Sequence, residues 1–192
     1  MLQKKSHILL SLLFFVLFIS INSKSWSETM LKDDFKNPNL WRYIADDVMG
    51  GLSQGQVDFE TINGSNIAIL RGNVSTENNG GFIQIRRELK NIALNEAQYV
   101  KIIAKGNNQK YFIFLRTTGT ILPWQYYSSQ FEVTDEFKEF ILPIDGFKKS
   151  GVLMTGKVNP KNITSIGIVA FGRDHQAELY IKQLEFKKDE YS

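Results

Sequence analysis

The chain has 192 residues, 23 of them basic and 20 acidic, with two histidines and no cysteine. The lack of cysteine excludes disulfide bonds, thiolate metal sites, a cysteine nucleophile and a lipoprotein anchor. Three of the lysines lie in the N-terminal segment described next, and without them 20 basic residues balance 20 acidic ones. A chain with no basic surplus lacks the charge that nucleic-acid binding needs, so nucleic acid is excluded as a partner.

A secretory signal peptide is the first element expected, over residues 1–27. Lys4 and Lys5 precede an uncharged apolar stretch, residues 8–21, and small serines follow it as far as Ser27. This order is typical of a cleaved leader, and the apolar stretch is shorter than the about 20 residues of a spanning helix. An uncleaved signal anchor is the alternative. The protein is therefore expected to be exported, periplasmic or extracellular, with no transmembrane helix in the mature chain.

The rest of the chain, residues 28–192, is expected to form a single all-β domain. Short β-prone runs alternate with clusters of Gly, Asn, Asp and Pro, and no stretch carries a sustained helical period. Strands at such spacing are typical of a β-sandwich or barrel. They are predicted at residues 56–61, 66–72, 81–86, 99–105, 110–117, 126–133, 137–142, 163–171 and 177–186.

Two of these strands carry patterns that predict more than their existence. Residues 111–115 are apolar at every position, as expected for a strand covered on both faces. Near the end of the chain, Leu179 and Ile181 follow one alternation phase, whereas Leu184 and Phe186 follow the other. A phase change of one residue within a strand predicts a β-bulge.

The turn at residues 46–53, DDVMGGLS, is the first candidate site. In a binding interpretation, its glycine amides and an Asp carboxylate contact a ligand or partner. In a structural interpretation, which we favour, the glycines shape the loop and an Asp accepts backbone N–H bonds. A phosphate loop is excluded because no Lys-Ser/Thr follows. The candidate contacts are Asp47, Met49, Gly50, Gly51 and Ser53.

Arginines at otherwise apolar strand faces are the second candidate. Arg86 shares a face with Gln84, and Arg116 follows Phe112 and Phe114 in phase. Both arginines could line a concave groove and donate hydrogen bonds to a carboxylate, to sugar hydroxyls or to a peptide backbone. The alternative is an ion pair with an acidic residue on a neighbouring strand.

Aromatic residues at the start of the next predicted strand are the third candidate. Trp124 and Tyr126 could stack on sugar rings or act as hot spots for a protein partner. Tyr126 and Tyr127 point to opposite sides if extended, so one of them is expected in the core. Gln130 shares the face of Tyr126 and would extend a polar groove.

Nothing in the sequence indicates catalysis. His175 is the one imidazole left after removal of the leader, and it lies in a predicted surface hairpin with no nucleophile and base around it. A hydrolase would need paired carboxylates whose separation a sequence does not give. No run has the alternating oxygen ligands of a calcium loop. We therefore predict no enzyme activity, no metal and no cofactor.

Several segments, in order, resemble the complex I intermediate-associated protein 30 family. Residues 41–55 (WRYIADDVMGGLSQG) resemble its opening motif, residues 80–86 (GGFIQIR) its second motif, and residues 140–147 (FILPIDGF) the end of its Leu-Pro strand. The resemblance covers essentially all of the mature chain. It implies a jelly-roll β-sandwich of the galactose-binding-domain-like type that binds without catalysis. The best-known members help to assemble the membrane NADH:ubiquinone oxidoreductase.

Two functions from different classes follow. The first is an assembly factor or chaperone that binds a protein partner, such as a subunit of a membrane complex, outside the cytoplasm. The second is a carbohydrate-binding module that uses Trp124, Tyr126 and the two arginines on a glycan. A secretory leader would separate this chain from the soluble arm of the oxidoreductase, so the fold and the binding role carry over further than the assembly role does.

Overall fold

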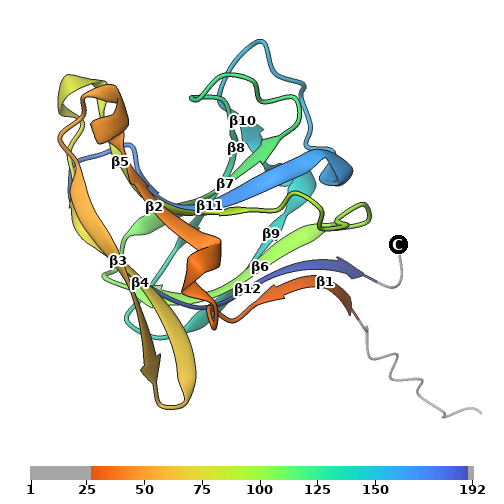
Figure 1. Ribbon diagram of the computed structural model, residues 1–192, viewed down its shortest axis with the longest axis horizontal. Coiled ribbons are helices and arrows are strands. Elements are labelled where there is room, and N and C mark those ends of the chain that lie inside the picture. Colours follow the sequence, from red (N-terminus) through yellow and green to blue (C-terminus); the bar gives the residue numbers. More distant parts are fainter. Residues whose placement is uncertain (1–26, 190–192) are drawn as a thin grey trace, which may run out of the picture.

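A computed structural model describes residues 27–189, which form two antiparallel six-stranded sheets packed face to face (Figure 1). The expected signal peptide, residues 1–27, lies outside the described residues except for Ser27. The strands are β1 (Ser27–Asp33), β2 (Trp41–Ala45), β3 (Gln54–Ile62), β4 (Ser65–Val74), β5 (Phe82–Glu88), β6 (Tyr99–Gly106), β7 (Lys110–Thr117), β8 (Tyr127–Glu132), β9 (Lys138–Pro143), β10 (Lys148–Lys149), β11 (Ile163–Phe171) and β12 (His175–Asp189). Five short 3-10 turns are the helical elements of this part of the chain: η1 (Pro38–Leu40), η2 (Asp46–Met49), η3 (Glu77–Asn79), η4 (Ile144–Gly146) and η5 (Pro160–Asn162).

The back sheet has the order β3-β4-β12-β6-β9, with β1 added beside β12, and the front sheet has the order β10-β8-β7-β11-β5-β2. This is a jelly-roll β-sandwich, as predicted, and every strand expected from the sequence is present. Strands β1, β2 and the two-residue β10 were missed. All three pair at or near a sheet edge with a strand distant in sequence, so local pattern alone does not reveal them.

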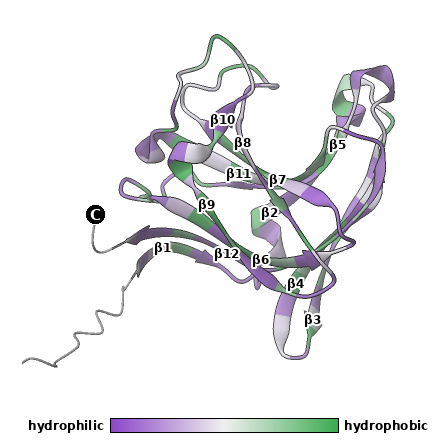
Figure 2. Cartoon of the chain, turned by 180° about the vertical axis from the view of Figure 1, so that it is seen from behind, coloured by the Kyte–Doolittle hydropathy of each residue, from purple (hydrophilic) through white to green (hydrophobic). Residues whose placement is uncertain are grey.

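The core lies between the two sheets because alternate side chains of each strand point inward. Figure 2 shows hydrophobic and hydrophilic residues interspersed along the strands. From the front sheet, Ile83 and Ile85 of β5 and Ile113 of β7 are fully buried. They face the back sheet, where Val100 and Ile102 of β6 are also fully buried. Each such side chain contributes about 1.5–3 kcal/mol relative to an exposed one.

The bulge predicted in the last strand is confirmed. The pairing of β12 with β6 shifts register between Ile181 and Gln183. As a result Leu179 and Ile181 before the shift and Leu184 and Phe186 after it are all fully buried. One extra residue keeps both halves of the strand facing the same core.

The all-apolar stretch of β7 has a different explanation from the one expected. Tyr111, Ile113 and Leu115 are fully buried in the core. Phe112 and Phe114 point to the outer face of the front sheet, which no further layer of structure covers. Phe114 is nevertheless buried, because aromatic rings from other segments pack on it. That outer face carries the candidate site.

A buried ion pair connects the two sheets. The Asp33 carboxylate, at the end of β1, accepts hydrogen bonds from Arg87 of β5, from the Trp41 indole nitrogen (2.9 Å) and from the Phe35 backbone amide (2.8 Å). Both charged side chains are nearly inaccessible. Within residues 27–189, no helix is long and apolar enough to cross a membrane.

Candidate functional site

The outer face of the front sheet forms the floor of a hollow of about 630 Å³. In Figure 1, the turns η2 and η3 rise at one end of this sheet, and the loops around residues 118–126 and 150–158 rise at the other. The hollow lies between these two rims. It is lined by Ile44, Val48, Met49, Asn79, Gly80, Phe82, Gln84, Arg86, Phe114, Arg116, Pro123, Trp124, Gln125, Tyr126, Ser150, Ser165 and Phe171.

Strand register arranges the floor in rows that cross the sheet. Arg86 of β5 lies opposite Gly167 of β11, which in turn lies opposite Phe114 of β7. In the next row, Ser165 lies opposite Arg116. Side chains in one row of an antiparallel sheet are near neighbours on the same face. The pairing therefore brings both arginines of the sequence analysis to one surface.

Gly167 leaves space in the centre of the floor. A Cβ atom there would lie 2.7 Å from Oε1 of Gln84, so any other residue would displace that amide. Gln84 is 3% exposed, and its Oε1 atom has no hydrogen-bond partner within the described chain. A buried amide without a partner costs free energy unless a ligand or water completes its hydrogen bonds.

One half of the floor is aromatic. The Tyr126 ring stacks on Phe114, with 3.8 Å between ring centroids and an interplanar angle of 9°. Phe171 packs edge-on against both rings, at 5.4 Å from Phe114 and 6.1 Å from Tyr126. Burial raises the pKa of the Tyr126 hydroxyl above its ordinary value. At the rim, Trp124 is 61% exposed, so its ring is available to a ligand.

The loop after β7 holds Arg116 in place. Its Nη2 donates to the carbonyl oxygens of Thr120 (3.2 Å) and Leu122 (3.0 Å), and its Nε lies 3.5 Å from the Thr120 hydroxyl. None of these partners is a carboxylate. The ion pair considered for Arg116 is therefore absent among residues 27–189, and its charge is not neutralised there.

Arg86 has no hydrogen bond or ion pair to any residue in the described range. Burial lowers the pKa of its guanidinium, the positive charges of Arg116 and Arg42 lower it further, and Glu88 opposes them. An arginine still stays protonated in a protein. A half-buried cation beside a second cation lowers stability, and the fold does not compensate it with a partner.

The turn at residues 46–53 is held together by Asp46. This buried carboxylate accepts hydrogen bonds from the Ser53 hydroxyl (2.5 Å) and amide (3.0 Å), and from the amides of Gly81 (2.5 Å) and Phe82 (3.1 Å). Burial raises the pKa of Asp46, but these hydrogen bonds outweigh it and hold the pKa below the usual range. The structural interpretation therefore applies to most of this turn.

The candidate residues of that turn separate accordingly. Ser53 is buried and engaged with Asp46, so the predicted ligand contact is replaced by a structural one. Gly51 packs against the Asp46 side chain, where a Cβ would clash, and Gly50 adopts a left-handed conformation at φ 86°. Asp47 is exposed and faces a separate depression beside Arg42. Of the five, Met49 alone lines the hollow.

The structure thus brings together Met49, Arg86, Arg116, Trp124 and Tyr126. Gln130 lies on the same face, opposite Phe112, but outside the lining. Sequence reasoning missed Phe171 and Ser150. Phe171 comes from the end of β11, and Ser150 is held by hydrogen bonds to Trp124 and Tyr126. No local signal marks either residue, because only the sheet order and the loop contacts place them here.

The ionisable or hydroxyl side chains of this hollow are those of Arg86, Arg116, Tyr126, Ser150 and Ser165 among the described residues. Its lining, within the described part of the chain, contains no Asp, Glu or His. His175 lies elsewhere, at the start of β12, where Nδ1 is 2.8 Å from the carbonyl oxygen of Arg173. Burial lowers the pKa of His175. Residues 27–189 hold no group of three or more side chains placed to bind a metal ion.

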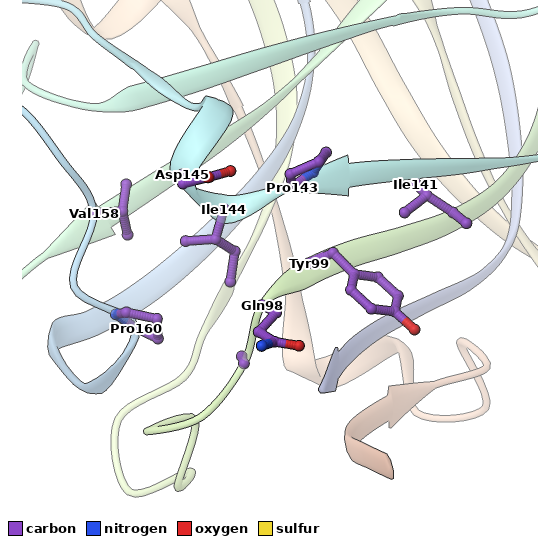
Figure 3. Close-up of a pocket in the computed structure, with 9 residues that line it drawn as sticks. Gln98, Tyr99, Ile141, Pro143, Ile144, Asp145, Val158 and Pro160 are labelled. Atoms are coloured by element: carbon purple, nitrogen blue, oxygen red, sulfur yellow. The ribbon is translucent and has the colours of Figure 1, made fainter. Parts of the chain in front are cut away.

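A second hollow, of about 570 Å³, lies beside β9, the edge strand of the back sheet (Figure 3). Ile141 of β9, Ile144 of η4 and Val158 of the loop before η5 contribute apolar side chains to it, and Asp145 is the acidic residue that lines it among residues 27–189. It has no cationic lining and no cluster of polar groups. We therefore place the candidate site on the front sheet.

The described part of the chain is a jelly-roll β-sandwich with an open hollow on its front sheet. The chain belongs to the complex I intermediate-associated protein 30 (CIA30) family, whose sequence model matches residues 30–181. No similar sequence was found among curated proteins.

Several solved structures with a similar fold are carbohydrate-binding modules. The family 11 module of a cellulosomal cellulase from Clostridium thermocellum has a TM-score of 0.67 and 12% identity, covering 85% of this chain and 96% of that one. The same kind of module in complex with a β-1,3-1,4-mixed-linked tetrasaccharide gives 0.66 and 12%, covering 83% and 94%. A family 30 module gives 0.53 and 11%, covering 88% and 92%. At these identities the likeness establishes the fold alone.

Asp46→Asn should destabilise the domain by about 2–3 kcal/mol at neutral pH, because an amide cannot accept all four hydrogen bonds. The pKa of Asp46 is lower in the folded state, so its contribution is fully present above the ordinary Asp value of about 3.9 and is lost as pH falls through the folded-state value. Urea unfolding from about pH 7 to about pH 2 should show the two proteins converging in acid. The exposed neighbour provides a control, since Asp47→Asn should change stability by less than about 0.5 kcal/mol.

Arg86→Met should leave the free energy of unfolding unchanged or raise it by up to about 1 kcal/mol, because it removes a half-buried cation that lacks a partner. Arg87→Met, one residue along the same strand, should instead cost about 3–5 kcal/mol by leaving Asp33 buried without its cation. Urea unfolding measures both. A loss above about 2 kcal/mol in Arg86→Met would show that this arginine is structural.

Proposed function

We propose that this chain is a non-catalytic binding module that takes a segment of a protein partner into the hollow on the front sheet. The observation that carries the proposal is the exposed apolar character of both rims. Val48 is 72% exposed and Met49 is 51% exposed on one rim, and Trp124 is 61% exposed on the other. Large apolar side chains gathered around a concavity are typical of protein-interaction sites.

The rim formed by the two loops is broader than the lining itself. Ile121, Val152 and Leu153 are each more than four-fifths exposed. Hydrogen bonds from the Ser150 hydroxyl to the Trp124 carbonyl oxygen (3.1 Å) and from the Tyr126 amide to that hydroxyl (3.0 Å) join the two loops. The loops therefore present one apolar surface, which a partner could cover as it enters the hollow.

Membership of the CIA30 family supports a role in assembling proteins, since the family is named for its association with an intermediate of complex I. The lining without Asp, Glu or His supports binding rather than turnover. The proposal therefore keeps the family's binding role, and does not identify the partner.

A glycan is the second candidate, favoured by a different observation. The exposed residue Trp124 lines the same hollow as Gln84 and two arginines, and an aromatic platform with polar donors suits sugar rings. The likeness in fold to a carbohydrate-binding module with a bound tetrasaccharide supports this alternative. The apolar rims favour a protein.

We further propose that the protein acts outside the cytoplasm, in the periplasm or the extracellular space. The basic start and apolar stretch of residues 1–27 support this location. Mass spectrometry of the protein recovered from its source should find a mature N-terminus close to residue 28. An intact N-terminus on membrane-bound protein would instead indicate the signal anchor.

Met49→Lys should abolish capture of the protein partner, because it puts a charge on the apolar rim without disturbing the core. The tagged wild-type chain and the variant would be used to capture partners from the source organism, and bound proteins would be identified by mass spectrometry. Ile62→Lys is the matched control, since Ile62 is an exposed apolar residue at the end of β3, far from the hollow.

A partner retained by Ile62→Lys and lost by Met49→Lys supports the proposal. A partner that both variants retain would contradict it. A second result would also contradict it. If no protein partner is captured, and a polysaccharide gel retains the wild-type chain but not Trp124→Ala, the module binds glycans.

A further inference from the structure

The hollow has a strong charge asymmetry. Arg86 and Arg116 line its floor, and Arg42 lies opposite Arg86 on the neighbouring strand. No acidic residue of the range 27–189 lines it. Glu88 is the acidic residue close enough to affect Arg86, but it is exposed and forms no ion pair with it. The bound segment therefore meets an excess of positive charge at one end of the floor.

The two arginines are prepared for a ligand in different ways. Carbonyl oxygens of Thr120 and Leu122 orient the Arg116 guanidinium and leave its Nη1 without a hydrogen bond within residues 27–189. Arg86 is half-buried and donates no hydrogen bond there. The repulsion between them, which also lowers the pKa of Arg86, is removed when an anion binds between the two groups.

The remaining floor groups indicate what surrounds that anion. The Gln84 amide can both donate and accept, and its Oε1 has no partner. Phe114 lies two strands across from Arg86 in the same row, and Tyr126 stacks on it. A ligand that fits this floor carries a planar anion and an apolar neighbour.

We infer that the hollow recognises an acidic residue of the partner protein, an Asp or Glu whose carboxylate binds Arg86 and Arg116 while flanking apolar residues cover Phe114 and the rims. This inference rests on the proposed function and names the chemistry that the site selects. A carboxylate matches the planar fork of a guanidinium.

A phosphate group fits this floor less well. It carries nearly two charges at neutral pH and takes three strong acceptor oxygens into the site. The aromatic half of the floor would also face a strongly hydrated group. A carboxylate on an aliphatic stem satisfies both halves.

The test compares two peptides of equal size and different charge. Acetyl-Leu-Glu-Leu-amide and acetyl-Leu-Gln-Leu-amide would be titrated into the full protein, and the arginine Nε–H signals followed by NMR, with assignments from Arg86→Lys and Arg116→Lys. The Glu peptide should shift the Arg86 and Arg116 signals saturably and bind about tenfold more tightly than the Gln peptide. Arg86→Met should remove this preference.

Arg71 provides an internal control. It lies in the back sheet, where Asp58 and Glu178 already form ion pairs with it, so its signal should not move. Equal binding of the two peptides, or an equal shift at Arg71, would overturn the inference. D-glucuronate and D-glucose form the third arm. Saturable binding of glucuronate without binding of either peptide would also overturn it, because the anion would then belong to a glycan.

Failure of this inference is distinguishable from failure of the proposed function. If Met49→Lys loses the captured partner and Arg86→Met keeps it, the hollow binds a protein but does not recognise an acidic residue in it. If Arg86→Met also loses the partner while remaining as stable as the wild type, both the site and its chemistry are supported.

Discussion

The pleat of the front sheet is the constraint on which the rest of this structure depends. Side chains alternate strictly across it, so Ile83, Ile85 and Ile113 can fill the core only if their neighbours point outward. The neighbours include Gln84, Arg86 and Phe114, which therefore share one outer face. Because the loops at both ends rise beside that face, it becomes a hollow instead of an open surface (Figure 1). Core packing and site assembly are thus two results of the same register.

Two adjacent arginines on opposite faces of β5 differ in whether an acidic residue neutralises their charge. On the core side, Arg87 forms a buried ion pair with Asp33 and strengthens the contact between the sheets. On the hollow side, Arg86 is half-buried without any such partner within the described chain. Adjacent residues of one strand therefore face opposite electrostatic environments. A residue that lowers stability and forms no stabilising interaction is a candidate for function, since binding sites commonly retain such residues.

Family membership and fold do not by themselves identify the ligand. The chain belongs to the CIA30 family, and the carbohydrate-binding modules compared with it share its fold at 11–12% identity. A shared sandwich does not transfer a ligand, because the side chains on its outer face can change while the core is kept. Here these side chains combine an aromatic floor, unneutralised guanidinium groups and apolar rims. This combination suits a protein segment that carries both apolar and acidic groups.

The sequence by itself determined the fold class, the main strands and even the bulge of β12, because these follow from local alternation and turn residues. It also named Arg86, Arg116, Trp124 and Tyr126 as candidate site residues, but left open an ion pair for each arginine and a core position for Tyr126 or Tyr127. It left the role of the turn at residues 46–53 open, and the buried Asp46 shows that this turn is mainly structural. Edge strands such as β2, the contribution of Phe171 and the lack of a partner for Arg86 were decided by tertiary structure alone. The physical reason is that these features depend on which distant strands pair, and pairing is fixed by the packing of the whole sandwich.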